Sequence, residues 1–116
     1  TEAGARPDGL RRARVALERA IARDGDAPLP LIAYFESYAK AGERVPEEAM
    51  AAMAKAIRLV PAAPASRLAL GTELVRQGQP DLARKLLYPV LFGPYESPER
   101  NAARTMLAAP GPVLAP

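Results

Sequence analysis

The spacing of the prolines limits the elements that this chain can form. Inside a helix, proline removes one hydrogen bond and clashes with the preceding turn at a cost of about 3 kcal/mol, whereas at the first helical position it costs almost nothing. Many of the chain's 13 prolines therefore mark the boundaries of short segments. The boundary prolines are Pro7, Pro28, Pro30, Pro46, Pro61, Pro64, Pro80, Pro94 and Pro98.

Within each segment, the apolar residues recur with the 3.6-residue period of a helix and never alternate over five residues as in a strand. We therefore expect an all-α fold of about six helices, with residues 8–108 as a single helical domain and residues 1–7 and 109–116 disordered. The expected helices span Asp8–Arg23, Leu29–Ala41, Pro46–Leu59, Ala65–Gln77, Pro80 to about Leu87, and Ser97–Ala108. Pro89 predicts that the fifth helix either ends near Leu87 or kinks there.

The same periodicity predicts the core and the helix ends. Gly42 and Gly78 suit left-handed caps at the ends of the second and fourth helices, and Ser97 suits an N-cap. The residues expected on the buried faces are Leu10, Ala13, Leu17, Ala20 and Ile21; Leu31, Tyr34, Phe35 and Tyr38; Ala49, Met53, Ala56 and Ile57; Leu70, Leu74 and Val75; and Leu82, Ala83, Leu86, Leu87 and Val90.

The chain contains no cysteine and no histidine. Disulfides, thiolate ligation of metals, Cys catalysis and the usual Ser-His arrangement are thereby excluded. The close acid pairs, Glu47–Glu48 and Asp24 with Asp26, lie at a helix start and in a turn, where carboxylates are common in any protein. We therefore expect no catalytic, cofactor-binding or metal-binding residues, and no enzymatic activity in this chain.

Arginine supplies 13 of the 16 cations that give the chain its net charge of +3. A composition rich in alanine, arginine and proline is typical of GC-rich bacterial genes, and we expect a bacterial protein. Arginines concentrate between Arg6 and Arg23, but acidic residues are interspersed and no aromatics accompany them, so we do not expect nucleic-acid binding. No apolar run approaches 18 residues, so we expect no membrane insertion. The composition leaves the compartment open between cytoplasm and periplasm.

The pattern of small and large residues repeats along the chain. The second and fourth helices end alike at a spacing of 36, with Gly42 matching Gly78, and the third and fifth helices match at 34, with Ala49 matching Ala83. Fixed-period similarity of this kind is typical of helical repeat proteins.

On these residues the chain resembles the tetratricopeptide repeat family. Leu70-Gly71, Gly78 and Ala83 stand at the family's Leu-Gly, turn glycine and small second-helix residue, and Pro61 stands at its repeat-ending proline. The match extends over about Asp8–Leu91. Leu74, Leu87 and Val90 in one unit, and Tyr38, Gly42, Ala49 and Ala56 in the other, occupy further positions of the pattern.

The chain departs from that pattern at three places. The tryptophan position holds Leu31 in one unit and Arg67 in the other, Phe35 replaces the glycine found at Gly71, and Pro61 has no counterpart in the second unit. A plain helical bundle built from the same hairpins is the alternative fold.

The resemblance implies that the first helix of each hairpin lines a concave groove. The groove residues would be Ile32, Glu36 and Lys40 in one unit and Leu68, Thr72 and Arg76 in the next, beside Ala39 and Val75. We therefore expect a protein-interaction or scaffold module that binds a peptide or protein partner there, and the open ends of so short an array would allow self-association. These residues would otherwise be the solvated sides of helices.

Two further expectations concern other parts of the chain. The alternative function is an accessory or substrate-positioning region of a larger bacterial enzyme whose catalytic residues lie outside this chain.

The aromatic residues form two groups along the chain. Tyr34, Phe35 and Tyr38 are expected in the core. Tyr88, Phe92 and Tyr95 are expected to pack under the last helix, and would otherwise form an exposed contact patch.

Overall fold

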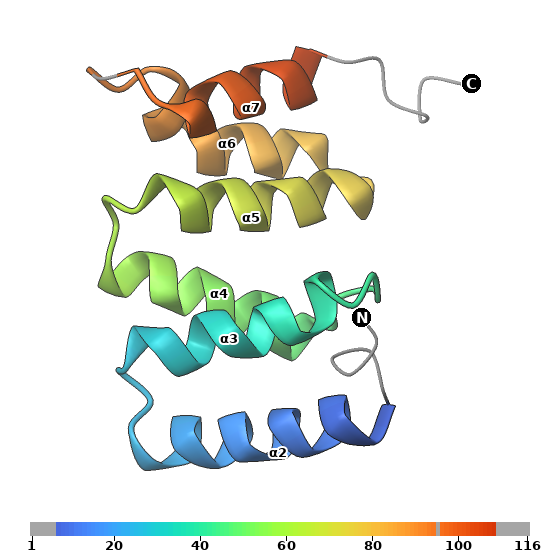
Figure 1. Cartoon of the computed structure of the whole chain (residues 1–116). Helices are drawn as coiled ribbons and strands as arrows, with labels where there is room; N and C mark the ends of the chain where they lie inside the picture. Colours follow the sequence, from blue (N-terminus) through green and yellow to red (C-terminus); the bar gives the residue numbers. More distant parts are fainter. Residues whose placement is uncertain (1–6, 95, 109–116) are drawn as a thin grey trace. The chain divides into compact units, whose positions relative to one another are not determined.

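The computed structural model describes residues 7–94 and 96–108, and over these residues it contains α-helices and no strand. The expected all-α class is therefore confirmed for the described part of the chain. Its six helices are α2 (Pro7–Arg23), α3 (Pro28–Ala39), α4 (Glu47–Leu59), α5 (Pro64–Arg76), α6 (Pro80–Leu91) and α7 (Pro98–Ala108) (Figure 1). The expected disorder of residues 1–7 and 109–116 concerns, apart from Pro7, residues outside the described part.

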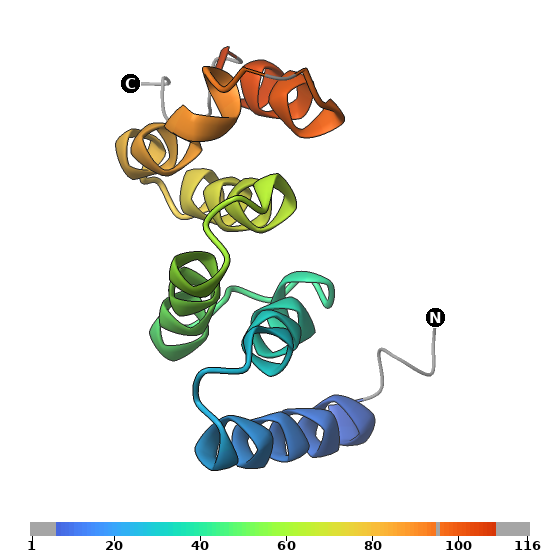
Figure 2. The same cartoon turned by 90° about the vertical axis from the view of Figure 1, so that its left-hand side faces the viewer.

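The described residues divide into two compact units, one up to Pro61 and one from Ala62. In the first unit α3 packs against both α2 and α4, and Figure 2 shows α3 and α4 nearly end-on. In the second unit α5, α6 and α7 pack against one another. Each unit thus consists of a helical hairpin and one further helix packed against it. The hairpins are α3–α4 and α5–α6, and the further helices are α2 and α7.

Proline and glycine set the ends of these helices as expected. Proline stands in the first turn of α3, α5 and α6. Gly42 and Gly78 have φ values of 75° and 80°, the left-handed region that favours glycine. Beside them, the amide of Glu43 donates to the carbonyl of Tyr38 at 3.1 Å, and the amide of Gln79 donates to that of Leu74 at 2.8 Å. Both hairpins therefore turn through the same hydrogen-bonded cap.

The second helix of each hairpin carries a fully buried alanine near its start. Ala49 of α4 and Ala83 of α6 are both 0% exposed. The residue one turn later fills the core, as Met53 in the first unit and Leu87 in the second. The predicted core of α4 is confirmed in full, since Ala56 and Ile57 are buried as well.

The second unit brings its hairpin helices close together at Gly71. A Cβ atom built on Gly71 would lie 2.7 Å from Cδ1 of Leu87, a side chain that has no exposed surface. The first unit has Phe35 at the corresponding position, and its ring is 1% exposed. In the first unit this part of the core is therefore filled by Phe35 of the first helix. In the second unit it is filled by Leu87 of the second helix.

Helix α6 continues past Pro89 to Leu91, further than the proline alone predicts. The ring removes one amide donor, but the amide of Phe92 still donates to the carbonyl of Tyr88 at 3.0 Å. Leu87 and Val90 are buried and fix this last turn to the core. Leu82, expected in the core, is instead 49% exposed, because the buried face of α6 follows Ala83 and Leu87.

Hydrogen bonds from a buried arginine, Arg100, join helix α7 to the end of α6. The Ser97 hydroxyl accepts a hydrogen bond from the amide of Arg100 at 3.0 Å, which confirms Ser97 as the N-cap. The Arg100 guanidinium donates to the carbonyl of Val90 at 3.1 Å and also to that of Gly93. Only 7% of Arg100 is exposed, so a residue type that sequence reasoning assigns to the surface closes this part of the core.

The expected packing of the second aromatic group is wrong. Tyr88 is 63% exposed and Phe92 is 69% exposed, and their ring centroids lie 4.8 Å apart on the surface of α6. Arg100 and the apolar side chains of α7, among them Met106 and Leu107, already cover the buried side of α6. Tyr95 lies outside the described residues. In the first aromatic group, Tyr34 and Phe35 are buried as expected, and Tyr38 is half-buried.

Within the described ranges, no helix is both long and apolar enough to cross a membrane, in agreement with the expectation from the sequence.

We predict that Gly71→Ala destabilises the chain although alanine is the better helix former. The new methyl group must displace Leu87, which costs about 1–3 kcal/mol and outweighs a propensity gain of about 1 kcal/mol. Urea unfolding followed by circular dichroism measures the change. In a Leu87→Ala background the clash is gone, and Gly71→Ala should become neutral or stabilising. An equal loss in both backgrounds would contradict close contact at this position.

Candidate partner-binding surface

The predicted groove residues of α3 lie beside its buried face. Ile32 and Glu36 are half-buried and Lys40 is exposed. The Lys40 ammonium lies 3.4 Å from the Glu36 carboxylate, one helical turn away. This strip of α3 therefore offers one apolar side chain followed by an exposed pair of opposite charges.

The corresponding residues of α5 are placed somewhat differently. Thr72 and Arg76 are exposed, but Leu68 is half-buried and packs against the core cluster of α6 and α7. The Thr72 hydroxyl donates to the carbonyl of Leu68 at 2.8 Å, and the Arg76 guanidinium lies 3.1 Å from the carboxylate of Glu73. Thr72 and Arg76 are thus the accessible part of this second strip.

Residues at a spacing of 36 occupy equivalent places in the two hairpins. Ile32 matches Leu68, and Lys40 matches Arg76. Each strip thus runs from an apolar residue within the helix to a cation at its C-terminal end, the cap residue Lys40 after α3 and Arg76 in the last turn of α5. Chemically, each strip can bury a partner's apolar side chain and place a cation near a carboxylate.

A buried acid supports the cation of α5. Glu73 is 2% exposed, and its second carboxylate oxygen accepts a hydrogen bond from the side-chain amide of Gln77 at 2.8 Å. Because Arg76 pairs with this fixed carboxylate, its guanidinium is held at the end of α5. Sequence reasoning did not single out Glu73, whose type is usually exposed.

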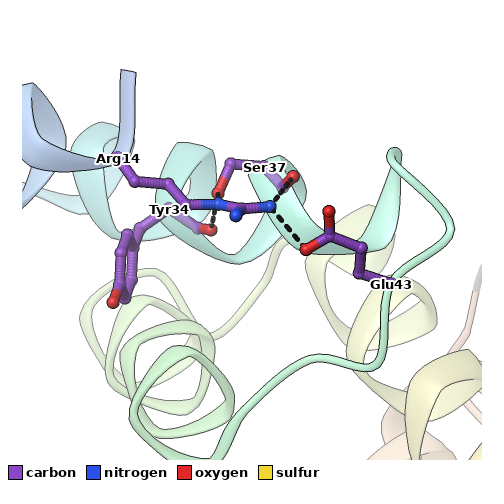
Figure 3. Close-up of polar contacts among 4 residues, drawn as sticks. All are labelled: Arg14, Tyr34, Ser37 and Glu43. Atoms are coloured by element: carbon purple, nitrogen blue, oxygen red, sulfur yellow. Dashed lines mark hydrogen bonds and ion pairs between the residues drawn. The ribbon is translucent and has the colours of Figure 1, made fainter. Parts of the chain in front are cut away.

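Arg14 of α2 joins α2 to α3 and to the loop that follows α3 (Figure 3). Its guanidinium donates to the hydroxyl of Ser37 at 3.1 Å, to the carbonyl of Ser37 at 2.8 Å, and to the carboxylate of Glu43 at 2.9 Å. The same group lies 3.7 Å from the ring centroid of Tyr38. The Arg14 side chain is 16% exposed and its contacts with Ser37 are partly buried, whereas the Glu43 side chain is 47% exposed. Together these contacts hold α3 on one side.

The position of Arg14 in the sequence indicates that its side chain has partners within the fold. Arg14 lies on the same helical stripe as Leu10, Leu17 and Ile21, three or four residues from each of its neighbours on that stripe. An arginine within an apolar stripe is expected to have partners in the fold.

Tyr34 adds a second polar contact between α2 and α3. Its hydroxyl donates to the carboxylate of Glu18 at 3.1 Å, and its ring stands edge-on to Tyr38, with centroids 5.7 Å apart. Burial raises the pKa of the Tyr34 phenol well above its usual value, and hydrogen bonding with Tyr38 and Glu18 raises it further. The phenol is therefore kept neutral as a donor between the two helices.

No family model matches this chain, and no curated protein or solved structure shows significant similarity to it.

We predict that Arg14→Lys lowers the free energy of unfolding by about 1–3 kcal/mol, because an ammonium cannot make all of these hydrogen bonds at once. Urea unfolding measures the loss. Arg12→Lys is the matched control on the exposed side of the same helix and should change stability by less than about 0.5 kcal/mol. Equal effects of the two variants would show that the Arg14 contacts add no stability.

The raised pKa of Tyr34 predicts a loss of stability in alkali. The unfolded phenol titrates near pH 10, whereas the folded one binds its proton more tightly. Its contribution is therefore complete below about pH 10 and declines as the pH rises further. In Tyr34→Phe this component should vanish, so that its stability falls less between pH 9 and 11 than that of the unchanged chain. Tyr88→Phe, at an exposed position, should retain the full decline.

Proposed function

We propose that this chain is a non-catalytic protein-interaction module of the tetratricopeptide-like class. The strip on α3 and the strip on α5 would each contact a peptide or protein segment. The contact residues are Ile32, Glu36 and Lys40 on α3 and Leu68, Thr72 and Arg76 on α5.

The repeated design of the two hairpins carries this proposal. Gly42 and Gly78 end the first helices in the same conformation, and Ala49 and Ala83 are buried in the second helices. A hairpin that recurs with the same cap and the same small contact residue is the unit from which helical repeat arrays are built. In such arrays, residues on one side of the first helices meet the partner.

The chemistry of the strips supports an extended or helical segment with both apolar and acidic residues as the partner. Ile32 and the accessible part of Leu68 would bury apolar side chains, and Lys40 and Arg76 would face carboxylates. Exposed ion pairs contribute about 0–1 kcal/mol each, so most of the affinity would come from shape and apolar contact. The charges would then select among partners of similar shape.

The test is a selection of peptides from a random library against the full chain. We expect selected peptides to combine apolar and acidic residues. Their affinity should fall about tenfold or more for a chain carrying Lys40→Glu and Thr72→Glu, because both changes place a carboxylate in the strips. Fluorescence anisotropy measures the affinity of each labelled peptide.

The matched control carries Arg58→Glu and Asn101→Glu, which change the net charge equally at exposed positions of α4 and α7. This control should retain the affinity. If both chains lose affinity equally, or if neither does, the strips are not the binding surface.

A further inference from the structure

Helix α2 carries a group of arginines on its solvent side. Arg11, Arg12, Arg19 and Arg23 are exposed there, and Val15, which is 41% exposed, lies among them. We call these five residues the arginine strip. Within its unit α2 packs against α3, through the opposite side that bears Arg14 and Leu17.

The arginine strip encloses a shallow depression with an apolar floor. Arg11, Arg12 and Arg19 line it together with Val15 and Ala16. Arg11, Val15, Arg19 and Arg23 follow one another at intervals of four residues and therefore form one row along the helix. The row continues over nearly the whole length of α2.

Three arginines of this strip, Arg12, Arg19 and Arg23, have no charged partner among the described residues. Over the residues that the structure describes, no ion pair or hydrogen bond of a side chain involves Arg12, Arg19 or Arg23. Arg14, one turn away, shows the contrast, since its guanidinium has three hydrogen bonds to α3 and the following loop. Arg12, Arg19 and Arg23 thus present uncompensated positive charge that an anionic partner would neutralise.

We propose that the arginine strip binds an acidic helical segment of another protein. Val15 and Ala16 are small enough to let a second helix approach closely, and arginines on both sides of them can reach carboxylates that flank the partner's apolar stripe. Guanidinium groups bind carboxylates through paired hydrogen bonds, which favours arginine at such a seam. This surface is separate from the strips of α3 and α5, and its proposal does not rest on theirs.

Other anionic or helical partners fit the strip less well. A helix that lies in a membrane interface needs large apolar residues, and the apolar residues of the depression are only Val15 and Ala16. Single-stranded nucleic acid is held by aromatic stacking, and the strip has no aromatic residue. A second copy of this chain also carries a net charge of +3, and no helix in the described ranges has more than two acidic residues.

The probe is a synthetic helical peptide of about three heptads, with Leu and Ala at the core positions and Glu at the flanking positions. A peptide with Gln in place of Glu is its uncharged counterpart. Fluorescence anisotropy measures binding of each labelled peptide to the full chain at low salt. We expect the Glu peptide to bind and the Gln peptide to bind at least tenfold more weakly.

Two triple variants localise the binding. Arg12→Gln, Arg19→Gln and Arg23→Gln together should weaken binding of the Glu peptide about tenfold, since each removes one exposed charge pair. The control, Arg44→Gln, Arg58→Gln and Arg104→Gln, removes three charges at exposed positions outside α2 and should change affinity less than twofold. Far-UV circular dichroism verifies that both variants keep their helices.

Two variants at Val15 distinguish a helical protein partner from other polyanions. Val15→Asp should abolish binding of the Glu peptide, whereas Val15→Ser should weaken it and leave binding of a DNA duplex unchanged. The proposal is overturned if the Glu peptide does not bind at low salt, or if both triple variants lose affinity equally. It is also overturned if the duplex or phosphatidylserine vesicles bind the strip more tightly than the Glu peptide does.

Discussion

The second helix of each hairpin carries a fully buried alanine near its start, at a place where only a methyl group has to be accommodated. Ala49 and Ala83 have no exposed surface, and Met53 and Leu87, one turn later, fill the core. A larger residue at either place would need space that the packed core does not offer. The left-handed caps at Gly42 and Gly78 end the first helix of each hairpin and let the chain reverse. The positions of the exposed strips on α3 and α5 follow from this packing.

Much of the fold can be predicted from the sequence, because prolines, glycines and apolar period act locally. The helix boundaries other than the end of α6, both glycine caps and the Ser97 cap follow from rules that concern a few neighbouring residues. Leu82 and Phe92 could not be placed in this way. Whether an apolar residue on the margin of a helix is covered depends on what its neighbours in the fold already fill, and Arg100 occupies the buried side of α6. The division into two compact units is likewise a property of long-range packing.

The candidate surfaces could likewise be predicted from the sequence only where they do not depend on long-range packing. The repeat spacing predicts that Lys40 and Arg76 occupy equivalent places, but the core contact of Leu68 depends on α7, which lies outside the repeat. Arginine has two roles in this chain that composition cannot separate. Arg14, Arg67 and Arg100 each donate to a backbone carbonyl of another element, whereas Arg12, Arg19 and Arg23 remain at the surface. The distinction depends on the position of each residue relative to the apolar stripe of its helix.

Arg100, the buried arginine of α7, affects the order in which parts of the chain can fold during synthesis. Val90 and Gly93 precede Arg100 on the emerging polypeptide, so their carbonyls must wait for a donor that the ribosome adds later. Helices α2, α3 and α4 belong to one compact unit that ends at Pro61, and compact units generally fold as a whole during synthesis. The second unit closes its core only when α7 has left the exit tunnel.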